Sequence, residues 1–301
     1  MTQLDFVVAP GGTLKGSFRV PGDKSISHRS IMFGSLAEGT THVSGFLQGE
    51  DSLNTLRSFR AMGVNIEGPD ASGRVVIHGV GMTGLKPPQQ PLDLGNSGTS
   101  IRLMSGLLSG QAFDVVLAGD RSLSKRPMKR VTDPLALMGA HVDTEEGGRP
   151  PLKIKGGQTL KGIDYVMPMA SAQVKSCLLL AGMYARGKTC VTEPAPTRDH
   201  TERMLTAFGY PVSRQGNTLC IEGGGKLTAC DIDVPADISS SAFFLVGASI
   251  AKDSDLTLRH VGVNPTRTGV IDILRLMGAN IELLNPREVG GEPVADIRIR
   301  S

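Results

Sequence analysis

The stretch AMGVNIE at residues 61–67 recurs as LMGAHVD at 137–143, AFGYPVS at 207–213 and LMGANIE at 276–282. The shared glycine falls at intervals of 76, 70 and 69 residues, which indicates one structural repeat copied along the chain. Apolar residues at helical spacing precede each glycine, so each copy contains a helix that the glycine ends. We therefore expect four repeats in the 301 residues.

Strand patterns surround each of these helices. VVIHG at 75–79, LKIKGG at 152–157, LCIEGGG at 219–225 and DIRIR at 296–300 alternate in polarity and predict the last strand of a hairpin. An earlier helix that opens on small hydroxyl residues, and a strand after it, complete a β-α-β-α-β-β repeat. The repeats either stack as a solenoid or wrap a small number of cores and bring several helix N-termini to one cleft.

Composition excludes several classes of partner. The 32 Lys and Arg residues nearly balance 29 Asp and Glu, so no basic face suited to duplex nucleic acid is expected. No apolar run approaches the length of a membrane span, and the start MTQLDFVVAPGG lacks the features of a signal peptide, so we expect a cytoplasmic protein. The cysteines, Cys177, Cys190, Cys220 and Cys230, form no CxxC pair and have no nearby His. We expect small buried apolar side chains there, without a zinc site or a disulfide framework.

Cations stand at the predicted starts of the helices. Lys24, Ser25 and Arg29 lie together in PGDKSISHR, with Ser25 and Arg29 one helical turn apart. Further arginines near helix starts are Arg102, Arg126 and Arg198. One such arginine is usually a solvated side chain, but several lining one cleft would bind a small polyanion, because the guanidinium fork matches carboxylate and phosphate geometry.

Other catalytic signatures are not found. The sequence contains no P-loop, no GxGxxG motif opening a helix after a strand, no GxSxG elbow and no HExxH motif. His28, His200 and His260 are scattered, and we expect structural or surface roles for them.

Five ordered motifs, PGDKSISHRS, LGNSGTSIR, SLSKRPM, MASAQVKS and TRDHTE, resemble those of the 5-enolpyruvylshikimate-3-phosphate (EPSP) synthases, also called 3-phosphoshikimate 1-carboxyvinyltransferases. The likeness spans nearly the whole chain and is nearest to the class II bacterial branch. It implies an α/β (α+β) fold, the inverse α/β barrel of enolpyruvyl transferases built of βαβαββ repeats. It also implies transfer of the enolpyruvyl group of phosphoenolpyruvate to the 5-hydroxyl of shikimate 3-phosphate, with release of phosphate, in the shikimate pathway towards chorismate and the aromatic amino acids. No metal or cofactor is implied.

The resemblance also assigns candidate site residues. The catalytic residue is Lys24, which would reach both substrates. The phosphoenolpyruvate site comprises Lys24, Asn96, Gly98, Arg126 and Gln173. The shikimate 3-phosphate site comprises Lys24, Ser25, Arg29, Ser171, Ala172, Gln173 and Arg198. Glyphosate is the expected inhibitor, and because some tolerant relatives carry alanine where this chain has Gly98, Gly98→Ala should raise the inhibitor constant.

The family has six repeats in two domains, whereas four are present here. Residues 22–235 match a complete three-repeat domain, and 1–21 with 236–301 match part of the second domain, with one repeat of three. The resemblance places the proton-transfer residues in the two other repeats, so no residue here inherits those roles, and Asp237 matches a structural position. We expect shikimate 3-phosphate binding with negligible turnover from this chain alone, and a monomer for the intact enzyme.

Two alternative functions remain open. UDP-N-acetylglucosamine enolpyruvyl transferase shares the fold, but it is expected to carry a cysteine before the Arg-Pro pair, where this chain has Ser124 and Lys125. A non-catalytic remnant that binds shikimate 3-phosphate is the other alternative.

Overall fold

The structure, a computed structural model, describes residue 7 and residues 11–301. Most of the stretch MTQLDFVVAP, on which the expectation about a signal peptide rests, lies outside the described residues. The first repeat consists of α1 (Lys24–Leu36), β3 (Thr40–Ser44), α2 (Glu50–Ala61), β4 (Asn65–Glu67) and β5 (Val75–His78). The second consists of β6 (Leu92–Asp93), α3 (Gly98–Ser109), β7 (Val115–Ala118), the 3-10 turn η1 (Leu123–Lys125), α4 (Lys129–Leu137), β8 (Val142–Glu145) and β9 (Arg149–Ile154).

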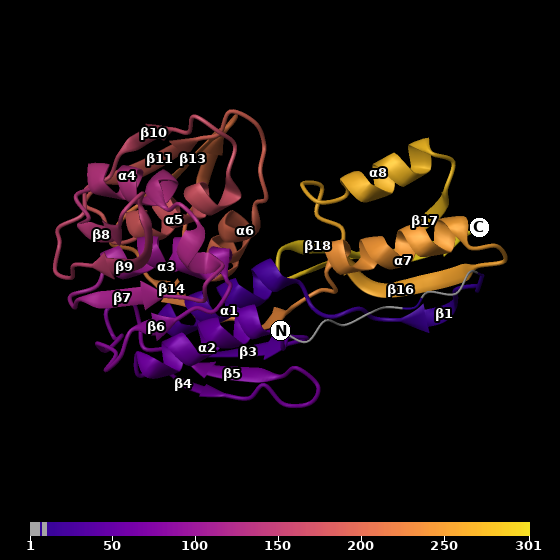
Figure 1. Cartoon of the computed structure of the whole chain (residues 1–301), viewed down its shortest axis with the longest axis horizontal. Coiled ribbons are helices and arrows are strands. Elements are labelled where there is room, and N and C mark those ends of the chain that lie inside the picture. The colour runs from indigo at the N-terminus through magenta and orange to yellow at the C-terminus, as the bar shows by residue number, and fades with distance from the viewer. Residues whose placement is uncertain (1–6, 8–10) are drawn as a thin grey trace. The chain divides into compact units, whose positions relative to one another are not determined.

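The third and fourth repeats follow the same plan (Figure 1). The third consists of β10 (Asp164–Val166), α5 (Ala172–Gly182), β11 (Lys188–Thr192), α6 (His200–Ala207), β12 (Ser213–Gln215) and β13 (Thr218–Glu222). The fourth consists of α7 (Ile238–Ile250), β16 (Asp255–Gly262), α8 (Gly269–Leu276), β17 (Asn280–Val289) and β18 (Glu292–Arg300). Outside the repeats are β1 (Lys15–Phe18), β2 (Ala37–Glu38), β14 (Leu227–Thr228) and β15 (Ile232–Asp233).

Each repeat has a four-stranded sheet, and the strands follow an equivalent order in all four sheets. The orders are β15-β3-β5-β4, β6-β7-β9-β8, β10-β11-β13-β12 and β1-β16-β18-β17, and β14 pairs with β2. In each four-stranded sheet the first two strands of this order are parallel. The predicted closing hairpin is antiparallel in β4–β5, β8–β9 and β12–β13, and in the fourth repeat β17 and β18 are hydrogen-bonded neighbours.

Two sheets take their first strand from a distant part of the chain. Strand β1 precedes α1 in sequence, yet Lys15 pairs with Asp255 in the sheet of the fourth repeat. Strand β15 precedes α7, yet Ile232 pairs with Val43 in the sheet of the first repeat. The chain therefore divides into two compact units. The large unit is Gly22–Val234 with Val289–Glu292, and the small unit is the chain up to Pro21 with Pro235–Glu288 and Pro293–Ser301.

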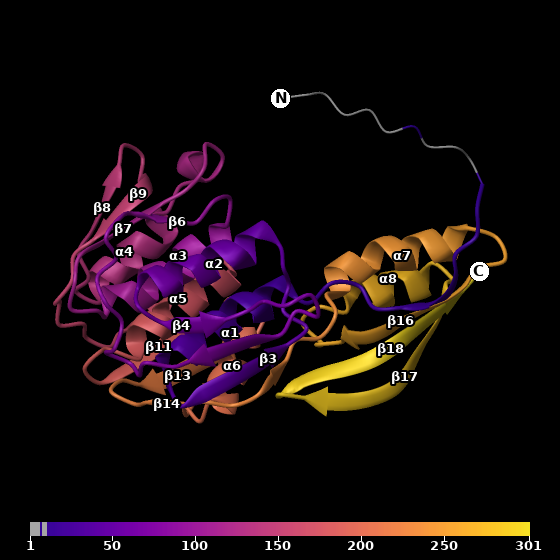
Figure 2. The same ribbon diagram turned by 90° about the horizontal axis from the view of Figure 1, so that it is seen from below.

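The large unit is built around three helices. Helices α1, α3 and α5 lie inside it, with the sheets of the first three repeats around them (Figures 1 and 2). They are buried around almost their whole circumference, as expected of helices in the core of a large domain. Helices α3 and α5 pack so closely that a Cβ on Gly106 would stand only 2.0 Å from the carbonyl oxygen of Cys177. Glycine at that position is therefore required for the packing.

The predicted helix ends are also found. Helices α2, α4, α6 and α8 are each followed by the repeated glycine, and its φ is +87° at Gly63, +92° at Gly139, +78° at Gly209 and +92° at Gly278. This left-handed conformation favours glycine and stops the helix.

In the small unit, α7 and α8 cover one face of the sheet β1-β16-β18-β17 (Figure 2). Its separate apolar core includes Leu256, Leu258, Ile297 and Ile299, each at most 1% exposed. Asp237 caps α7, since its Oδ1 accepts a hydrogen bond from the amide of Ser239, and it pairs with Arg267 at 3.0 Å.

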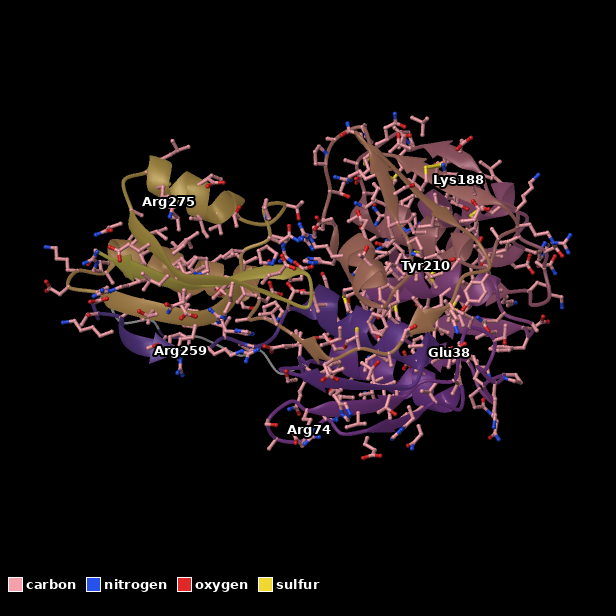
Figure 3. All side chains as sticks on the ribbon, turned by 180° about the vertical axis from the view of Figure 1, so that it is seen from behind. Glu38, Arg74, Lys188, Tyr210, Arg259 and Arg275 are labelled. Carbon is pink, nitrogen blue, oxygen red and sulfur yellow. A yellow bond between two sulfur atoms is a disulfide. The ribbon has the colours of Figure 1, made fainter. Side chains whose placement is uncertain are left out.

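The expectation about the cysteines was wrong in two respects, because Cys230 is only partly buried and two of the others are bonded to each other. Cys190 and Cys220 form a disulfide, visible as a yellow bond near the Lys188 label (Figure 3). The reason is strand register: β11 and β13 are antiparallel, and Cys190 lies directly opposite Cys220. Register cannot be deduced from cysteines 30 residues apart in sequence. Cys177 is buried as expected, and burial raises the pKa of its thiol to about 12.

Candidate functional site

Three of the predicted helix starts lie in the large unit and are capped by side chains. Asp23 caps α1 by accepting from the amide of Ile26 at 3.0 Å. Ser97 caps α3 and Ser171 caps α5 in the same way. The cap satisfies one of the free amides in the first turn of a helix, and the remaining amides with the helix dipole favour an anion.

Arg29 joins three helices in the interior. Its Nε donates to Thr201 Oγ1 at 2.8 Å and its NH2 donates to Ser176 Oγ at 3.0 Å, while its NH1 donates to the carbonyl oxygen of Ser25 at 3.0 Å. The Ser176 and Thr201 hydroxyls are themselves 2.7 Å apart. These contacts bring the starts of α1 and α6 to the side of α5, and we call Ser25, Arg29, Ser176 and Thr201 the Arg29 cluster.

Arg29 is only 5% exposed, and its charge is under opposing influences. Burial lowers the pKa of Arg29 to about 10, and the carboxylate of Glu202 acts in the opposite direction. Arg198, in the exposed loop before α6, also lowers the pKa of Arg29, because two like charges stand near each other. At neutral pH the guanidinium therefore remains charged while a second cation lies close by.

A second group surrounds Gln173, two residues into α5. The side-chain oxygen of Gln173 accepts from Arg102 NH1 at 3.0 Å and from Arg130 NH2 at 3.1 Å, and its nitrogen donates to Thr99 Oγ1 at 3.2 Å. Arg102 NH1 also donates to the carbonyl oxygen of Gly98. Burial lowers the pKa of Arg102 to about 10, with Arg130 next among the causes.

Gly98 is the first residue of α3 and lies next to the guanidinium groups of Arg102 and Arg126. A Cβ at Gly98 would stand 2.8 Å from NH1 of Arg102 and 2.8 Å from NH1 of Arg126. Arg126 also donates to the side-chain oxygen of Asn96, whose nitrogen donates to Asp120 at 2.9 Å. We call Asn96, Gly98, Arg102, Arg126, Arg130 and Gln173 the Gln173 cluster.

Lys24 lies at the start of α1 and is half-exposed. Its Nζ is 3.1 Å from Oδ2 of Asp51 in the first turn of α2. Helix α1 also carries His28. Its Nδ1 is 2.8 Å from Thr55 Oγ1, and its Nε2 is 3.5 Å from Oγ of Ser97, the cap of α3. The starts of α1 and α3 are therefore neighbours. Burial lowers the pKa of His28 to about 3, so His28 is neutral and serves a structural role, as expected.

Six of the ten predicted site residues belong to two clusters linked by α5: Ser25 and Arg29 to one, and Asn96, Gly98, Arg126 and Gln173 to the other. The other four, Lys24, Ser171, Ala172 and Arg198, lie outside both clusters. Helix α5 supplies Ser171, Ala172 and Gln173 at its start, and Ser176 one turn later in the Arg29 cluster. The separate observations from the sequence therefore converge within the large unit. Sequence reasoning assigned no role to Arg130, Ser176 and Thr201, although Ser176 and Thr201 lie inside the quoted motifs MASAQVKS and TRDHTE.

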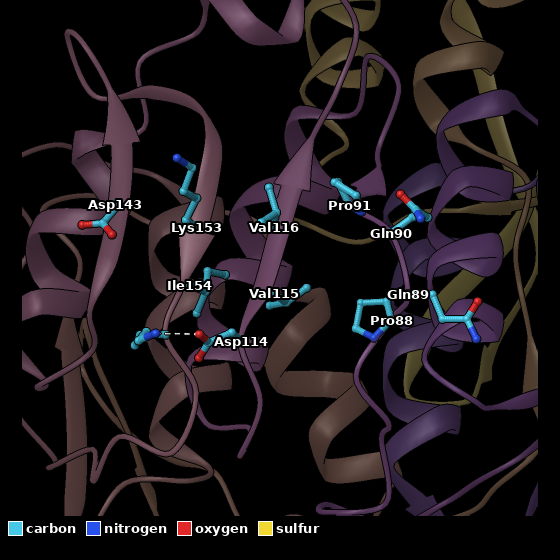
Figure 4. Close-up of a pocket in the computed structure, with 11 residues that line it drawn as sticks. Pro88, Gln89, Gln90, Pro91, Asp114, Val115, Val116, Asp143, Lys153 and Ile154 are labelled. Carbon is cyan, nitrogen blue, oxygen red and sulfur yellow. Dashed lines mark hydrogen bonds and ion pairs between the residues drawn. The ribbon is translucent and has the colours of Figure 1, made fainter.

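A surface pocket of about 400 Å³ lies elsewhere. Its lining comes from the segment 88–91 and from strands β7, β8 and β9 with their neighbours, and it includes the ion pair of Lys155 and Asp114 at 2.7 Å (Figure 4). Its lining includes none of the predicted site residues. The pocket and the two clusters therefore occupy different parts of the large unit.

Two groups of observations bear on metals and membranes. In residues 7 and 11–301, no cluster of three or more His, Cys, Asp and Glu side chains is placed to hold a metal ion. None of the helices in the described part of the chain combines the length and apolar character that crossing a bilayer requires.

Comparison with known proteins finds similar sequences over almost the whole chain. The model of a family described as EPSP synthase (3-phosphoshikimate 1-carboxyvinyltransferase) matches residues 8–301. The 3-phosphoshikimate 1-carboxyvinyltransferase of Methylococcus capsulatus is 72% identical over 295 residues, which are 98% of this chain and 67% of the relative. That of Alkalilimnicola ehrlichii is 69% identical over 298 residues, 99% of this chain and 67% of the relative.

A solved structure gives the same result. The EPSP synthase from Acinetobacter baumannii superposes with a TM-score of 0.91 at 63% identity, covering 97% of this chain and 65% of that chain. The chain spans about two thirds of the length of these relatives.

The βαβαββ sheets around three buried helices, together with these likenesses, define the class as an α/β enolpyruvyl transferase. The chain belongs to the EPSP synthase family, the 3-phosphoshikimate 1-carboxyvinyltransferases. The predicted fold class, family and enzyme class are confirmed, and UDP-N-acetylglucosamine enolpyruvyl transferase is not favoured.

Proposed function

We propose that the large unit of this chain binds shikimate 3-phosphate and phosphoenolpyruvate for enolpyruvyl transfer. The observation that carries the proposal is Arg29, a buried guanidinium that Ser176 and Thr201 hold in one orientation beside the start of α5. A buried, oriented cation costs desolvation energy, and a bound anion offsets that cost. A phosphate and a carboxylate on each substrate match such sites.

The Arg29 cluster is the proposed site for shikimate 3-phosphate. Its phosphate would be bound by Ser25, Arg29 and Arg198 and by the start of α5, with Ser171, Ala172 and Gln173. Arg198 is exposed and its charge acts on Arg29, so the two cations could share one dianionic group. A dianion would relieve their mutual repulsion.

The Gln173 cluster together with Lys24 is the proposed site for phosphoenolpyruvate. The ligands would be Lys24, Asn96, Gly98, Arg126 and Gln173. The 5-hydroxyl would lose its proton and attack C2 of phosphoenolpyruvate as C3 gains a proton, which gives a tetrahedral ketal. The ketal would then lose phosphate from C2 and a proton from C3, which restores the double bond of the enolpyruvyl group. Lys24, as the catalytic residue, and Arg126 would stabilise the charge that develops on the phosphate and the carboxylate. The proton-transfer groups are not among the residues assigned here.

The remaining expectations belong to the same proposal. The protein would act in the cytoplasm, without a metal or organic cofactor, and the intact enzyme would be a monomer. Glyphosate would compete with phosphoenolpyruvate in the Gln173 cluster.

Calorimetric titration of the 301-residue chain with shikimate 3-phosphate tests the first part. We expect saturable binding that Arg29→Met weakens by about a hundredfold, because a charge-assisted pair of hydrogen bonds is lost. The matched control is Arg57→Met, since Arg57 is an exposed residue of α2 that pairs with Glu50. Equal affinity in wild type and Arg29→Met would refute the assignment, and phosphate release measured on the same protein reports turnover.

Gly98→Ala tests the assignment of the second cluster. Its methyl group would displace the guanidinium ends of Arg102 and Arg126, which are flexible, so the fold should tolerate the change. In a catalytically competent form of the enzyme, we expect the glyphosate inhibition constant to rise by at least about tenfold. An unchanged constant would contradict the placement of the inhibitor beside Gly98.

A further inference from the structure

Lys175 is a buried charge that the proposed mechanism does not use. It lies on α5 between the two clusters, and its side chain is 0% exposed. Its Nζ is 3.1 Å from Oε2 of Glu193 and 2.7 Å from Oε1 of Glu202, and both carboxylates are almost completely buried. A lysine in such a place is rare unless it is paired, and its removal leaves uncompensated charge behind.

The two carboxylates belong to the elements that carry the Arg29 cluster. Glu193 directly follows β11 and accepts a hydrogen bond from Thr197, the residue before Arg198. Glu202 follows Thr201, which accepts from Arg29. Lys175 itself precedes Ser176, the other partner of Arg29. Lys175 therefore connects α5, the loop of Arg198 and the first turn of α6.

Each of the two carboxylates interacts with a second cation besides Lys175. Glu193 has a second cation, Arg214, with its NH2 at 3.2 Å from Oε2, and Arg214 is about half-exposed. Glu202 is paired with Lys175 and also attracts Arg29 electrostatically. Without Lys175, Glu202 would lose this ion pair, and its attraction for Arg29, which the neighbouring Thr201 contacts, would be uncompensated. An anionic ligand would then compete with Glu202 for the same guanidinium.

We propose that Lys175 is a positioning residue that neutralises Glu202 and so leaves Arg29 free to bind a phosphate group. This inference rests on the proposed function, because it concerns the affinity of the Arg29 cluster for shikimate 3-phosphate. A role in packing alone makes a different prediction, since an apolar side chain of similar length would replace a packing lysine without loss of affinity.

The test uses the full chain with three variants: Lys175→Met, Lys175→Met/Glu202→Gln and Glu202→Gln. The dissociation constant for shikimate 3-phosphate is measured by calorimetry, and folding is verified by thermal unfolding. Lys175→Met should weaken binding by at least about tenfold, and the double variant should restore most of that loss, because the competing carboxylate is neutral. Glu202→Gln alone should strengthen binding by about threefold, because less negative charge faces Arg29.

A matched control is Lys155→Met, which breaks the exposed ion pair with Asp114 and should leave the affinity unchanged. If the wild-type chain binds shikimate 3-phosphate and Arg29→Met does not, the proposed function holds. A failed prediction for the Lys175 or Glu202 variants then contradicts only the role of Lys175. Wild-type affinity in Lys175→Met, or no recovery in the double variant, overturns the inference. If Lys175→Met does not fold, Glu202→Gln decides the question. The inference is then overturned if Glu202→Gln binds shikimate 3-phosphate no more tightly than the wild type. A wild-type chain that binds no shikimate 3-phosphate would refute the proposed function and this inference with it.

Discussion

Helices α1 and α7 occupy the same position in their repeats, and both are thirteen residues long. Helix α1, KSISHRSIMFGSL, contains a lysine, a histidine and an arginine, yet it buries every residue from Ile26 to Leu36. Helix α7, ISSSAFFLVGASI, carries no charge and buries only Ile238, Ser241, Leu245 and Ala248. The more polar helix is thus the more deeply buried one.

The difference shows that burial here is set by neighbours and not by composition. Helix α1 packs against α2, α3, α6 and its own sheet, which allows Arg29 and His28 to be buried with partners from other helices. On α7, Phe243 is 79% and Ile250 is 78% exposed, and on α8, Leu276 is 88% exposed. An exposed apolar surface of this kind is more often a site of interaction than a surface that stays in contact with water.

The largest expected effect contrasts the two helices directly. Phe33→Ala should destabilise the large unit by about 3–5 kcal/mol, because Phe33 is fully buried in α1 and packs edge-to-face on Phe208. Phe243→Ala on α7 should change stability by less than about 0.5 kcal/mol. Denaturant unfolding of both variants measures the difference. Similar losses in the two variants would mean that α7 is as well packed as α1.

The disulfide gives the next largest effect. In the chain-entropy account, closing a loop of 30 residues contributes up to about 3.6 kcal/mol, so reduction of Cys190–Cys220 should lower the unfolding midpoint of the large unit. The small unit has neither cysteine and should be unaffected. Thermal unfolding with and without a thiol reductant, using Cys190→Ser/Cys220→Ser as control, measures this. A reductant effect that persists in the double variant would rule out the disulfide as its source.

The pH dependence of the large unit should reflect His28. Its pKa is about 3 in the folded chain against 6.5 for an ordinary histidine, so between these values only the unfolded chain binds the proton. Stability should therefore be fully present above pH 6.5 and fall as the pH drops from 6.5 towards 3, by at most about 1.4 kcal/mol per pH unit. His28→Asn should reduce that slope. Parallel pH profiles in the two proteins would contradict a neutral buried His28.

The smallest effect on stability is expected on the exposed face. Phe243→Ser/Leu276→Ser should leave the unfolding midpoint almost unchanged, since both side chains already contact water. The same variant should bind less of a dye that recognises apolar surface and should associate less at high concentration. Fluorescence titration and light scattering measure these changes. Undiminished dye binding would locate the apolar surface elsewhere.

Much of the fold could be predicted because its signals are local. The repeated glycines, Gly63 and its equivalents, end helices through a backbone conformation that belongs to the residue itself. Serines at Ser97 and Ser171 mark helix starts for the same kind of reason. The resemblance then supplied candidate ligands, and most of them lie in the two clusters.

What could not be predicted depends on pairing between distant segments. Arg29 was expected as a ligand, but its hydrogen bonds to Ser176 and Thr201 cross 147 and 172 residues. The partners of Lys175 and the disulfide of Cys190 likewise depend on strand register and helix packing. None of these contacts has a signal in the spacing of the sequence.

The pairing of β1 with β16 has a consequence for synthesis. A ribosome makes Lys15 early, yet its partner Asp255 follows only after the whole of Gly22–Val234 has been translated. Strand β1 therefore has no partner strand until the first three repeats have been synthesised, and these repeats can fold before it pairs. A nascent chain of this kind would complete its middle first and join its beginning to its later part last, and chaperones that recognise extended segments would have the longest access to residues 11–21.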